Sequence, residues 1–234
     1  MTHAAFDDIG PARTTGGARP VRPRDAATLI IIDERHGRPH VLMGRRNAGH
    51  DFMPDKWVFP GGRIDRSDFR APAATELRPD VAARLQRTAP AHRCRALALT
   101  AIRETFEEAG LLLARPGPGR IAAGPWREFL EQGALPDLAA LEFIARAITP
   151  ANSPKRFDAR FFMAPASALI SLEPQADCGE LGEIAWFSLE RALALDLPSV
   201  TRFVLGEIPK RLVDPSRPAP SLSFARGRQQ LVHL

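Results

Sequence analysis

The strongest hydrophobic pattern in the chain lies between residues 94 and 110. Apolar side chains recur there at spacings of three, four and three residues, at Leu99, Ile102, Phe106 and Ala109. That spacing is the helical period, and it gives a helix one buried side. Gly110 stands where a left-handed residue commonly ends a helix. The pattern therefore predicts a helix over residues 94–109.

Shorter apolar runs predict strands. Leu29-Ile30-Ile31-Ile32 predicts a buried strand over residues 26–33, and the turn residues at 36–39 predict a hairpin to a partner strand at 40–46. Further strands are expected at residues 56–59, 111–114, 156–164 and 183–187. Helices are expected at residues 79–87, 125–132, 189–194 and 198–210, and residues 141–149 are expected to pass from a helix end into a strand. Hairpin strands mixed with flanking helices predict an α+β fold, with a mixed sheet sandwiched between helices (α/β/α).

The chain is long enough to bury one hydrophobic core, with 234 residues of which 44% are hydrophobic. We expect one domain over residues 25–213, interrupted at about 69–93 by an insertion rich in Ala, Pro and Arg. Residues 1–24 are rich in Gly, Pro, Arg and Thr and are expected to be disordered. Residues 214–234 are rich in Pro and Ser and are expected to form a loose tail.

The formal net charge of +5 is concentrated at the two ends of the chain. Residues 1–24 hold four Arg against two Asp, and residues 210–234 hold five Lys or Arg against one Asp, so the rest is close to neutral. A nucleic-acid-binding protein usually carries its basic residues on one folded patch, so we expect no nucleic-acid partner. No apolar run reaches membrane-spanning length and no signal peptide is evident, which predicts a cytoplasmic protein with no membrane partner. Cys94 and Cys178 are expected to be plain thiols.

Three carboxylates share one side of the predicted helix, because Glu104, Glu107 and Glu108 stand at i, i+3 and i+4. Like charges at this spacing repel by roughly a few tenths of a kcal/mol per pair. Carboxylate oxygens suit a hard divalent ion, Mg²⁺ or Mn²⁺, and Mg²⁺ is commonly bound together with substrate phosphates. The alternative is a solvated acidic face on an ordinary amphipathic helix. Three acids in this arrangement, with Arg103 beside them, favour metal binding.

The run Arg103-Glu104-Thr105-Phe106-Glu107-Glu108-Ala109-Gly110-Leu111 resembles the second half of the Nudix box, Arg-Glu-x-x-Glu-Glu-x-Gly-hydrophobic. Nudix hydrolases cleave nucleoside diphosphates that are linked to another moiety. The start of the family pattern, a glycine, five residues and an acid, corresponds to Gly62 and Asp68. Asp68 and Arg103 are 35 positions apart, so the box is split by a long extra segment. The resemblance implies a Nudix fold and the cleavage of a diphosphate bond.

The resemblance also implies roles for the box residues. Glu104, Glu107 and Glu108 correspond to metal-binding acids, and the carbonyl of Gly62 corresponds to a backbone ligand of Mg²⁺ or Mn²⁺. The catalytic set it implies is these three glutamates with Arg103.

The first acid of the box has a structural role in the family, where it pairs with the box arginine. Asp68 is our candidate partner for Arg103, and Asp65 is the alternative. The general base varies within the family, so Glu104 and two later acids, Glu180 and Glu183, stay open as candidates. An ordinary surface acid is the simpler interpretation of the two later residues.

A second stretch narrows the resemblance to one subgroup. Ile148-Thr149-Pro150, followed by Arg156-Phe157-Asp158-Ala159-Arg160-Phe161-Phe162, and the split box resemble the peroxisomal type of coenzyme A diphosphatase and its bacterial relatives. The implied substrate is coenzyme A (CoA) or an acyl-CoA, cleaved to 3′,5′-ADP and a phosphopantetheine product by a monomer or homodimer. ADP-ribose or NADH is the alternative substrate class, and a nucleotide-binding module without catalysis is a further alternative.

Four arginines are candidate substrate ligands, because guanidinium groups match the geometry of phosphates: Arg45, Arg46, Arg63 and Arg156. Arg63 directly follows the glycine turn. Arg45 and Arg46 could instead be ordinary strand-end charges, and Arg156 could face outward from a strand together with Asp158.

Trp57 and Phe59 precede the glycine turn and could either stack on a base or belong to the core. We expect the insertion to lie at the mouth of the site, because box residues flank it on both sides.

Overall fold

The computed structural model describes residues 21–47, 54–118, 124–151, 153, 155–174, 181–225 and 228–234. Within this part of the chain, nine strands form one sheet whose main order is β11-β10-β7-β8-β1-β2-β3, with β4 beside β1 and β9 beside β2. The strands of this sheet are β1 (Arg24–Arg35), β2 (Arg38–Arg46), β3 (Trp57–Val58), β4 (Gly61–Arg63), β7 (Glu142–Ile148), β8 (Phe157–Pro165), β9 (Leu181–Ser188), β10 (Pro220–Ala225) and β11 (Arg228–His233). The β1–β8 and β7–β10 pairs are parallel and the other pairs are antiparallel, so the predicted mixed sheet is confirmed.

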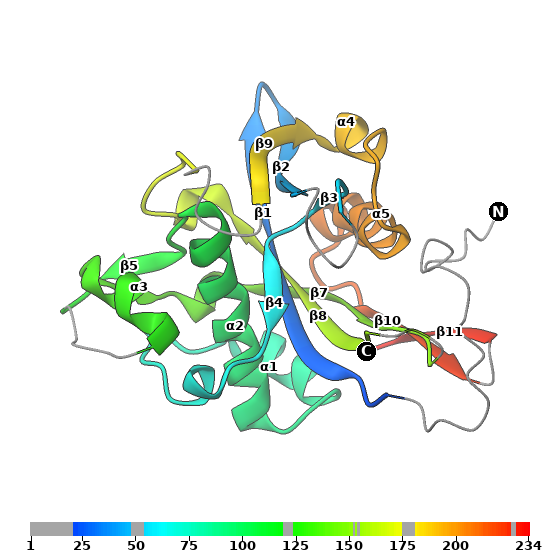
Figure 1. Cartoon of the computed structure of the whole chain (residues 1–234), viewed down its shortest axis with the longest axis horizontal. Helices are drawn as coiled ribbons and strands as arrows, with labels where there is room; N and C mark the ends of the chain where they lie inside the picture. Colours follow the sequence, from blue (N-terminus) through cyan, green and yellow to red (C-terminus); the bar gives the residue numbers. More distant parts are fainter. Residues whose placement is uncertain are drawn as a thin grey trace.

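Helices cover both faces of this sheet (Figure 1). The described helices are α1 (Pro79–Gln86), α2 (Ala91–Ala109), α3 (Arg127–Glu131), α4 (Leu189–Leu193) and α5 (Ser199–Val213). One buried cluster joins β1 to α1 and α2, and a second joins the opposite face to α4 and α5. The predicted sandwich of a sheet between helices is therefore confirmed.

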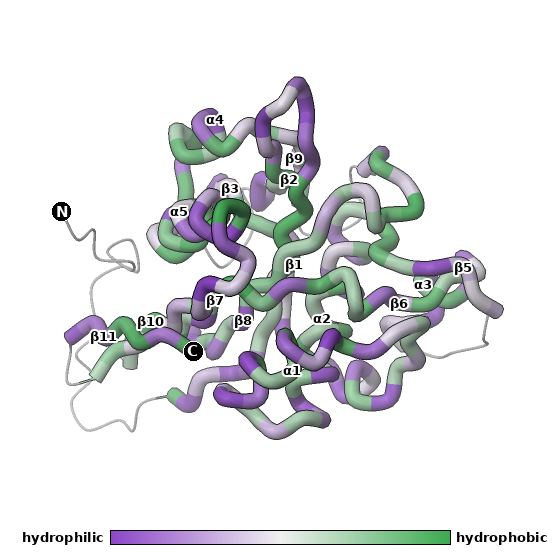
Figure 2. Tube along the Cα trace, turned by 180° about the vertical axis from the view of Figure 1, so that it is seen from behind, coloured by the Kyte–Doolittle hydropathy of each residue, from purple (hydrophilic) through white to green (hydrophobic). Residues whose placement is uncertain are grey.

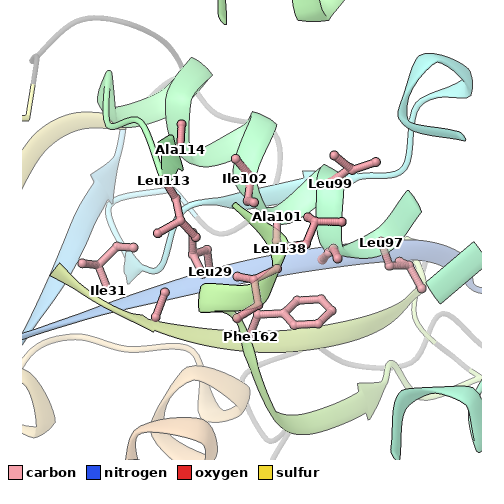
Figure 3. Close-up of a cluster of buried hydrophobic side chains, with 14 of the residues drawn as sticks. Leu29, Ile31, Leu97, Leu99, Ala101, Ile102, Leu113, Ala114, Leu138 and Phe162 are labelled. Carbon is pink, nitrogen blue, oxygen red and sulfur yellow. The ribbon is translucent and has the colours of Figure 1, made fainter. Parts of the chain in front are cut away.

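The larger core packs the helix with three glutamates against the sheet. Figure 3 shows side chains of β1 and α2 meeting Leu138 and Phe162 in this cluster; those labelled on the two elements are Leu29, Ile31, Leu97, Leu99, Ala101 and Ile102. These labelled side chains are fully shielded from solvent. Burying a Leu or Ile side chain contributes roughly 1.5–3 kcal/mol. The helix is thereby fixed against the sheet with its acidic side directed away from this core.

The predicted β1–β2 hairpin is also confirmed. Ile32 pairs with Val41 and Arg35 with Arg38, and the turn between them uses positive φ at His36 and Gly37. Figure 2 shows hydrophilic positions at the tip of this hairpin and hydrophobic positions further along β2.

Helix α2 begins three residues before the position expected, at Ala91 rather than Cys94. Pro90 precedes its first residue, and proline is well suited to a helix start because it lacks an N–H that would have no partner there. Gly110 ends the helix with φ of 67°, as expected. Cys94 is buried within the helix, and Cys178 lies outside the described residues.

Two short segments differ from the expected elements. The strand expected at residues 111–114 begins only at its last residue, as β5 (Ala114–Pro116), and it pairs with β6 (Ala134–Pro136) in a separate two-stranded sheet. Residues 141–149 were expected to begin as a helix end, which is wrong. A short 3₁₀ turn at Leu138–Ala140 precedes them, and Glu142–Ile148 is strand β7 throughout.

The expectation of a loose tail from Asp214 is also wrong. Strand β10 (Pro220–Ala225) pairs with β11 (Arg228–His233), and β10 adds to the main sheet through Ser221, which pairs with Arg146. Leu222 is fully buried in the core under α5. Residues 1–20, most of the expected disordered segment, lie outside the described residues, whereas β1 already begins at Arg24. No helix in the described part of the chain is long and apolar enough to cross a membrane.

Candidate active site

The site forms where the glycine turn meets α2. Strand β4 lies antiparallel to β1, with Gly61 opposite Thr28 and Gly62 opposite Ala27. The backbone N–H of Gly61 donates a hydrogen bond of 3.0 Å to Oε2 of Glu108. A Cβ atom on Gly62 would overlap the carboxylate of Glu104. Glycine is therefore needed here because the turn and the carboxylate approach each other more closely than any side chain would permit.

The two halves of the split box meet in the interior. Asp68 is fully buried, and its carboxylate accepts two hydrogen bonds from Arg103, of 2.9 Å from Nε and 3.0 Å from Nη2. The predicted Asp68–Arg103 pair is therefore confirmed. Asp65, the alternative partner, instead caps the 3₁₀ turn Arg66–Phe69 by accepting from Ser67, and these hydrogen bonds lower the pKa of Asp65.

Sequence reasoning missed three further donors to Asp68. The indole N–H of Trp126 donates at 2.9 Å, the hydroxyl of Thr100 at 2.8 Å and the backbone N–H of Asp65 at 2.8 Å. Thr100 could have been found, since it stands one helical turn before Arg103 on the same side of α2. Trp126 had no such signal, because it lies 58 positions from Asp68 on a different element.

Arg103 also holds the acidic side of the helix. Its Nη1 contacts Oε1 of Glu104 at 2.8 Å and Oε2 of Glu107 at 2.7 Å, and its Nη2 donates to the carbonyl of Arg63 at 3.0 Å. The side chain is 5% exposed, so these interactions are poorly screened by water. One guanidinium group thus links the turn, the first acid of the box and two of the three helix glutamates.

The environment raises the pKa of two of these glutamates. Burial, opposed by Arg103 and reinforced by Glu107, raises the pKa of Glu104 to about 7. Burial likewise raises the pKa of Glu107, again opposed by Arg103. Ionised Glu104 is therefore costly in the protein without an additional cation, because Arg103 alone does not compensate for its loss of hydration.

These residues fit a divalent ion that is shared with a substrate. Among the described residues, no three acidic, His or Cys side chains converge into a complete metal cage. Mg²⁺ seldom needs one, since it is usually held by one or two carboxylates together with substrate phosphates and water. The carboxylates of Glu104, Glu107 and Glu108 line one cleft beside Gly61 and Gly62, and a cation there would offset the burial of Glu104.

The cleft has a volume of about 1810 Å³. Three of the four candidate phosphate ligands line it, namely Arg46, Arg63 and Arg156. The fourth, Arg45, is absent from the lining and pairs with Asp55 at 3.4 Å on the surface. The structure therefore does not bring Arg45 to the cleft with the other three candidates, and its position matches the strand-end charge that was the alternative.

Other candidates have structural positions. Trp57 packs edge-to-face on Phe187, with ring centroids 4.9 Å apart, and Phe59 is buried in the second core although it reaches the cleft. Glu183 is exposed on β9 and does not line the cleft. Glu180 lies outside the described residues.

The insertion does not form the mouth of the site, contrary to expectation. Of residues 69–93, only Arg93 lines the cleft. Helix α1 buries Val81 and Leu85 in the larger core, and Arg84 at its end pairs with Glu142 at the start of β7. The insertion therefore supports α2 from the side opposite the carboxylates.

Known proteins resemble this chain along most of its length, although no family model matches it. A NUDIX hydrolase from Alicyclobacillus acidocaldarius has a similar structure, with a TM-score of 0.58 and 29% identity over 79% of this chain and 90% of that one. A Caenorhabditis elegans protein named as nudix hydrolase 7 is 29% identical over 70% of this chain and 50% of its own length. Acyl-coenzyme A diphosphatase NUDT19 of Gallus gallus is 27% identical over 60% of this chain and 54% of its own length.

The chain thus spans about half the length of the curated relatives it matches. The described site has the parts that the resemblance implies: the glycine turn, the buried Asp68–Arg103 pair and three glutamates on one helix side. These relatives, the likeness in structure and the meeting of the two box halves in the interior all make the chain similar to Nudix hydrolases.

Proposed function

We propose that this chain is a divalent-metal-dependent hydrolase that cleaves the diphosphate bond of CoA or an acyl-CoA. The observation that carries the hydrolase part is the arrangement of Glu104 and Glu108 around the Gly61-Gly62 turn, fixed by the buried Asp68–Arg103 pair. The relationship to an acyl-CoA diphosphatase at 27% identity supports the choice of substrate.

The chain's own residues can divide the work of the reaction. Glu104, Glu107 and Glu108 would hold Mg²⁺ or Mn²⁺ on one side of the cleft. When bound, the ion supplies neutralisation of phosphate oxygens and a lower pKa of bound water. Arg63, exposed on β4 beside the turn, is positioned to contact the diphosphate through its guanidinium fork.

Glu104 is the best-placed general base of the candidates. Its carboxylate lies against the glycine turn and lines the cleft, where it could accept a proton from a water beside the diphosphate. Glu183 is exposed and away from the cleft lining. Water adds to one phosphorus, the P–O–P bond breaks, and the proton passes to the base.

The test is a hydrolysis panel with Mg²⁺ or Mn²⁺ and CoA, acetyl-CoA, ADP-ribose and NADH as substrates. We expect release of 3′,5′-ADP from CoA or acetyl-CoA, reduced by about a hundredfold or more in Glu107→Gln and Glu108→Gln. Glu131→Gln, which changes an exposed glutamate on α3, serves as the control.

Two other outcomes would change the proposal. Cleavage of ADP-ribose or NADH in preference to CoA would keep the hydrolase and discard the CoA substrate. Tight nucleotide binding without cleavage of any substrate would identify a binding module, despite the three glutamates.

A further inference from the structure

The cleft carries unmatched positive charge at positions away from the glutamates. Among the described residues, five arginines of the lining make no ion pair with a carboxylate: Arg22, Arg24, Arg63, Arg66 and Arg156. By contrast, two arginines of the lining pair with acids: Arg93 pairs with Asp25, and Arg103 pairs with Asp68. A concave surface with guanidinium groups that lack carboxylate partners attracts anions.

Two of these arginines lie side by side. The backbone N–H of Arg24 donates to the carbonyl of Arg156 at 2.9 Å, just where β1 and β8 begin to pair. The glycine turn lies beside β1 further along that strand, where Gly61 of β4 is opposite Thr28. Four residues therefore separate the two positions along β1, which is about 13 Å at the usual rise of a strand.

The guanidinium group of Arg156 is held in place without being neutralised. Its Nε donates to the carbonyl of Thr149 at 3.1 Å and its Nη1 to the carbonyl of Val21 at 2.6 Å. Its Nη2 donates to no atom of the described residues. Burial lowers the pKa of Arg156, and no carboxylate opposes that effect, in contrast to Arg146, which pairs with Asp158.

We propose that Arg24 and Arg156 bind a phosphomonoester group of the substrate, separate from the diphosphate at the glutamates. A diphosphate is too short to reach both ends of the cleft, whereas a nucleoside that carries a diphosphate and a second phosphate group can. This inference rests on the proposed function, and it makes these two arginines determinants of substrate choice. Arg63 stays with the diphosphate, because it follows the glycine turn directly on β4.

The experiment compares CoA with dephospho-CoA, which lacks only the phosphomonoester. We expect the wild-type protein to have the higher kcat/KM for CoA. Arg24→Gln and Arg156→Gln should each reduce kcat/KM for CoA by about tenfold, mainly through KM, and leave that for dephospho-CoA nearly unchanged. Arg87→Gln, an exposed arginine at the end of α1, is the matched control and should change neither value.

Arg24→Gln is the cleaner variant, because the Arg24 side chain makes no hydrogen bond within the described residues, whereas Arg156→Gln also removes two bonds to carbonyls. If Arg24→Gln reduced kcat/KM equally for CoA and dephospho-CoA, the inference would be overturned. Arg24 would then attract anionic substrates in general and would not bind the phosphomonoester.

A second measurement separates this inference from the proposed function. Calorimetric titration of 3′,5′-ADP and of AMP needs no catalysis, and we expect the wild-type protein to bind 3′,5′-ADP about tenfold more tightly, a preference that Arg24→Gln abolishes. If CoA is not cleaved but this preference is found, the function fails and the binding site stands. If CoA is cleaved but the preference is absent, or unchanged in the variant, the binding site fails and the function stands.

Discussion

The carboxylate of Asp68 and the guanidinium group of Arg103 form a two-point ion pair in the protein interior, although 35 positions separate them. Asp68 is fully buried and Arg103 is 4% exposed. The pair joins the 3₁₀ turn after the glycines to the middle of α2. The pair therefore holds the two halves of the Nudix-like box in position although the insertion separates them in the chain.

Breaking this pair should cost stability. Asp68→Asn leaves Arg103 buried with less compensation, and removing one partner of a buried pair typically costs about 3–5 kcal/mol. Urea unfolding followed by fluorescence should report the loss. The control is Glu76→Gln, which breaks the exposed pair with Arg95 and should cost less than about 1 kcal/mol. Equal effects of the two substitutions would contradict the structural role of Asp68.

Glu104 should make the metal-free protein less stable as the pH rises. Its pKa is about 7 in the folded protein and about 4.5 when unfolded, so the folded state binds the proton more tightly. The resulting stability is complete below pH 4.5 and is lost as the pH rises through 7. Glu104→Gln should therefore exceed the wild-type protein in stability by up to about 3 kcal/mol at pH 8, with no such gain below pH 4.5.

Thermal unfolding across this pH range, with a chelator present, would test the effect of Glu104. Mg²⁺ at pH 8 should stabilise the wild-type protein more than the variant. A constant difference between the two proteins from pH 4 to pH 8 would rule out the buried carboxylate as its cause.

Gly62→Ala should reduce activity more than stability. The added Cβ overlaps the end of the flexible Glu104 side chain, which can move aside at small cost. A displacement of a catalytic group by about 1 Å can lower the rate by about a hundredfold. The measurement is kcat together with the melting temperature.

Two other glycine substitutions serve as controls for Gly62→Ala. Gly206→Ala on α5 meets no atom within 4 Å, so it should be neutral or stabilising by about 0.5–1 kcal/mol. Gly61→Ala would meet the backbone of β1 and should cost stability directly. Normal activity in Gly62→Ala would show that the close approach to Glu104 has no role in the reaction.

The insertion should act on stability rather than on substrate affinity. Leu85 on α1 is fully buried in the larger core, and Leu→Ala substitutions at such sites cost about 2–5 kcal/mol. We expect Leu85→Ala to lower the midpoint of urea unfolding while KM stays unchanged at temperatures where the protein is folded. Deletion of residues 69–93 should prevent folding. A changed KM in fully folded Leu85→Ala would show that the insertion does affect substrate binding.

The catalytic helix could be predicted from sequence because its signals are local. The spacing of Leu99, Ile102 and Phe106 and the stop at Gly110 are all contained in one helix. The Asp68–Arg103 pair could also be predicted from sequence, because the motif specifies an acid and an arginine that pair even when the chain between them is long.

The features that could not be predicted from sequence depend on contacts between segments that are distant in the chain. Strand β10 begins with Pro220 and reads as a loop, and it becomes a strand because Ser221 pairs with Arg146 and Leu222 enters the core. Trp126 reaches Asp68 from another element for the same reason. No pattern within either segment specifies such a partner.

Arg103 gives the acidic side of α2 a counter-ion of its own. Its Nη1 contacts both Glu104 and Glu107, although burial still outweighs these contacts and raises the pKa of both carboxyl groups. A divalent ion at this side of the helix would therefore have to share these carboxylates with a guanidinium group that already contacts them.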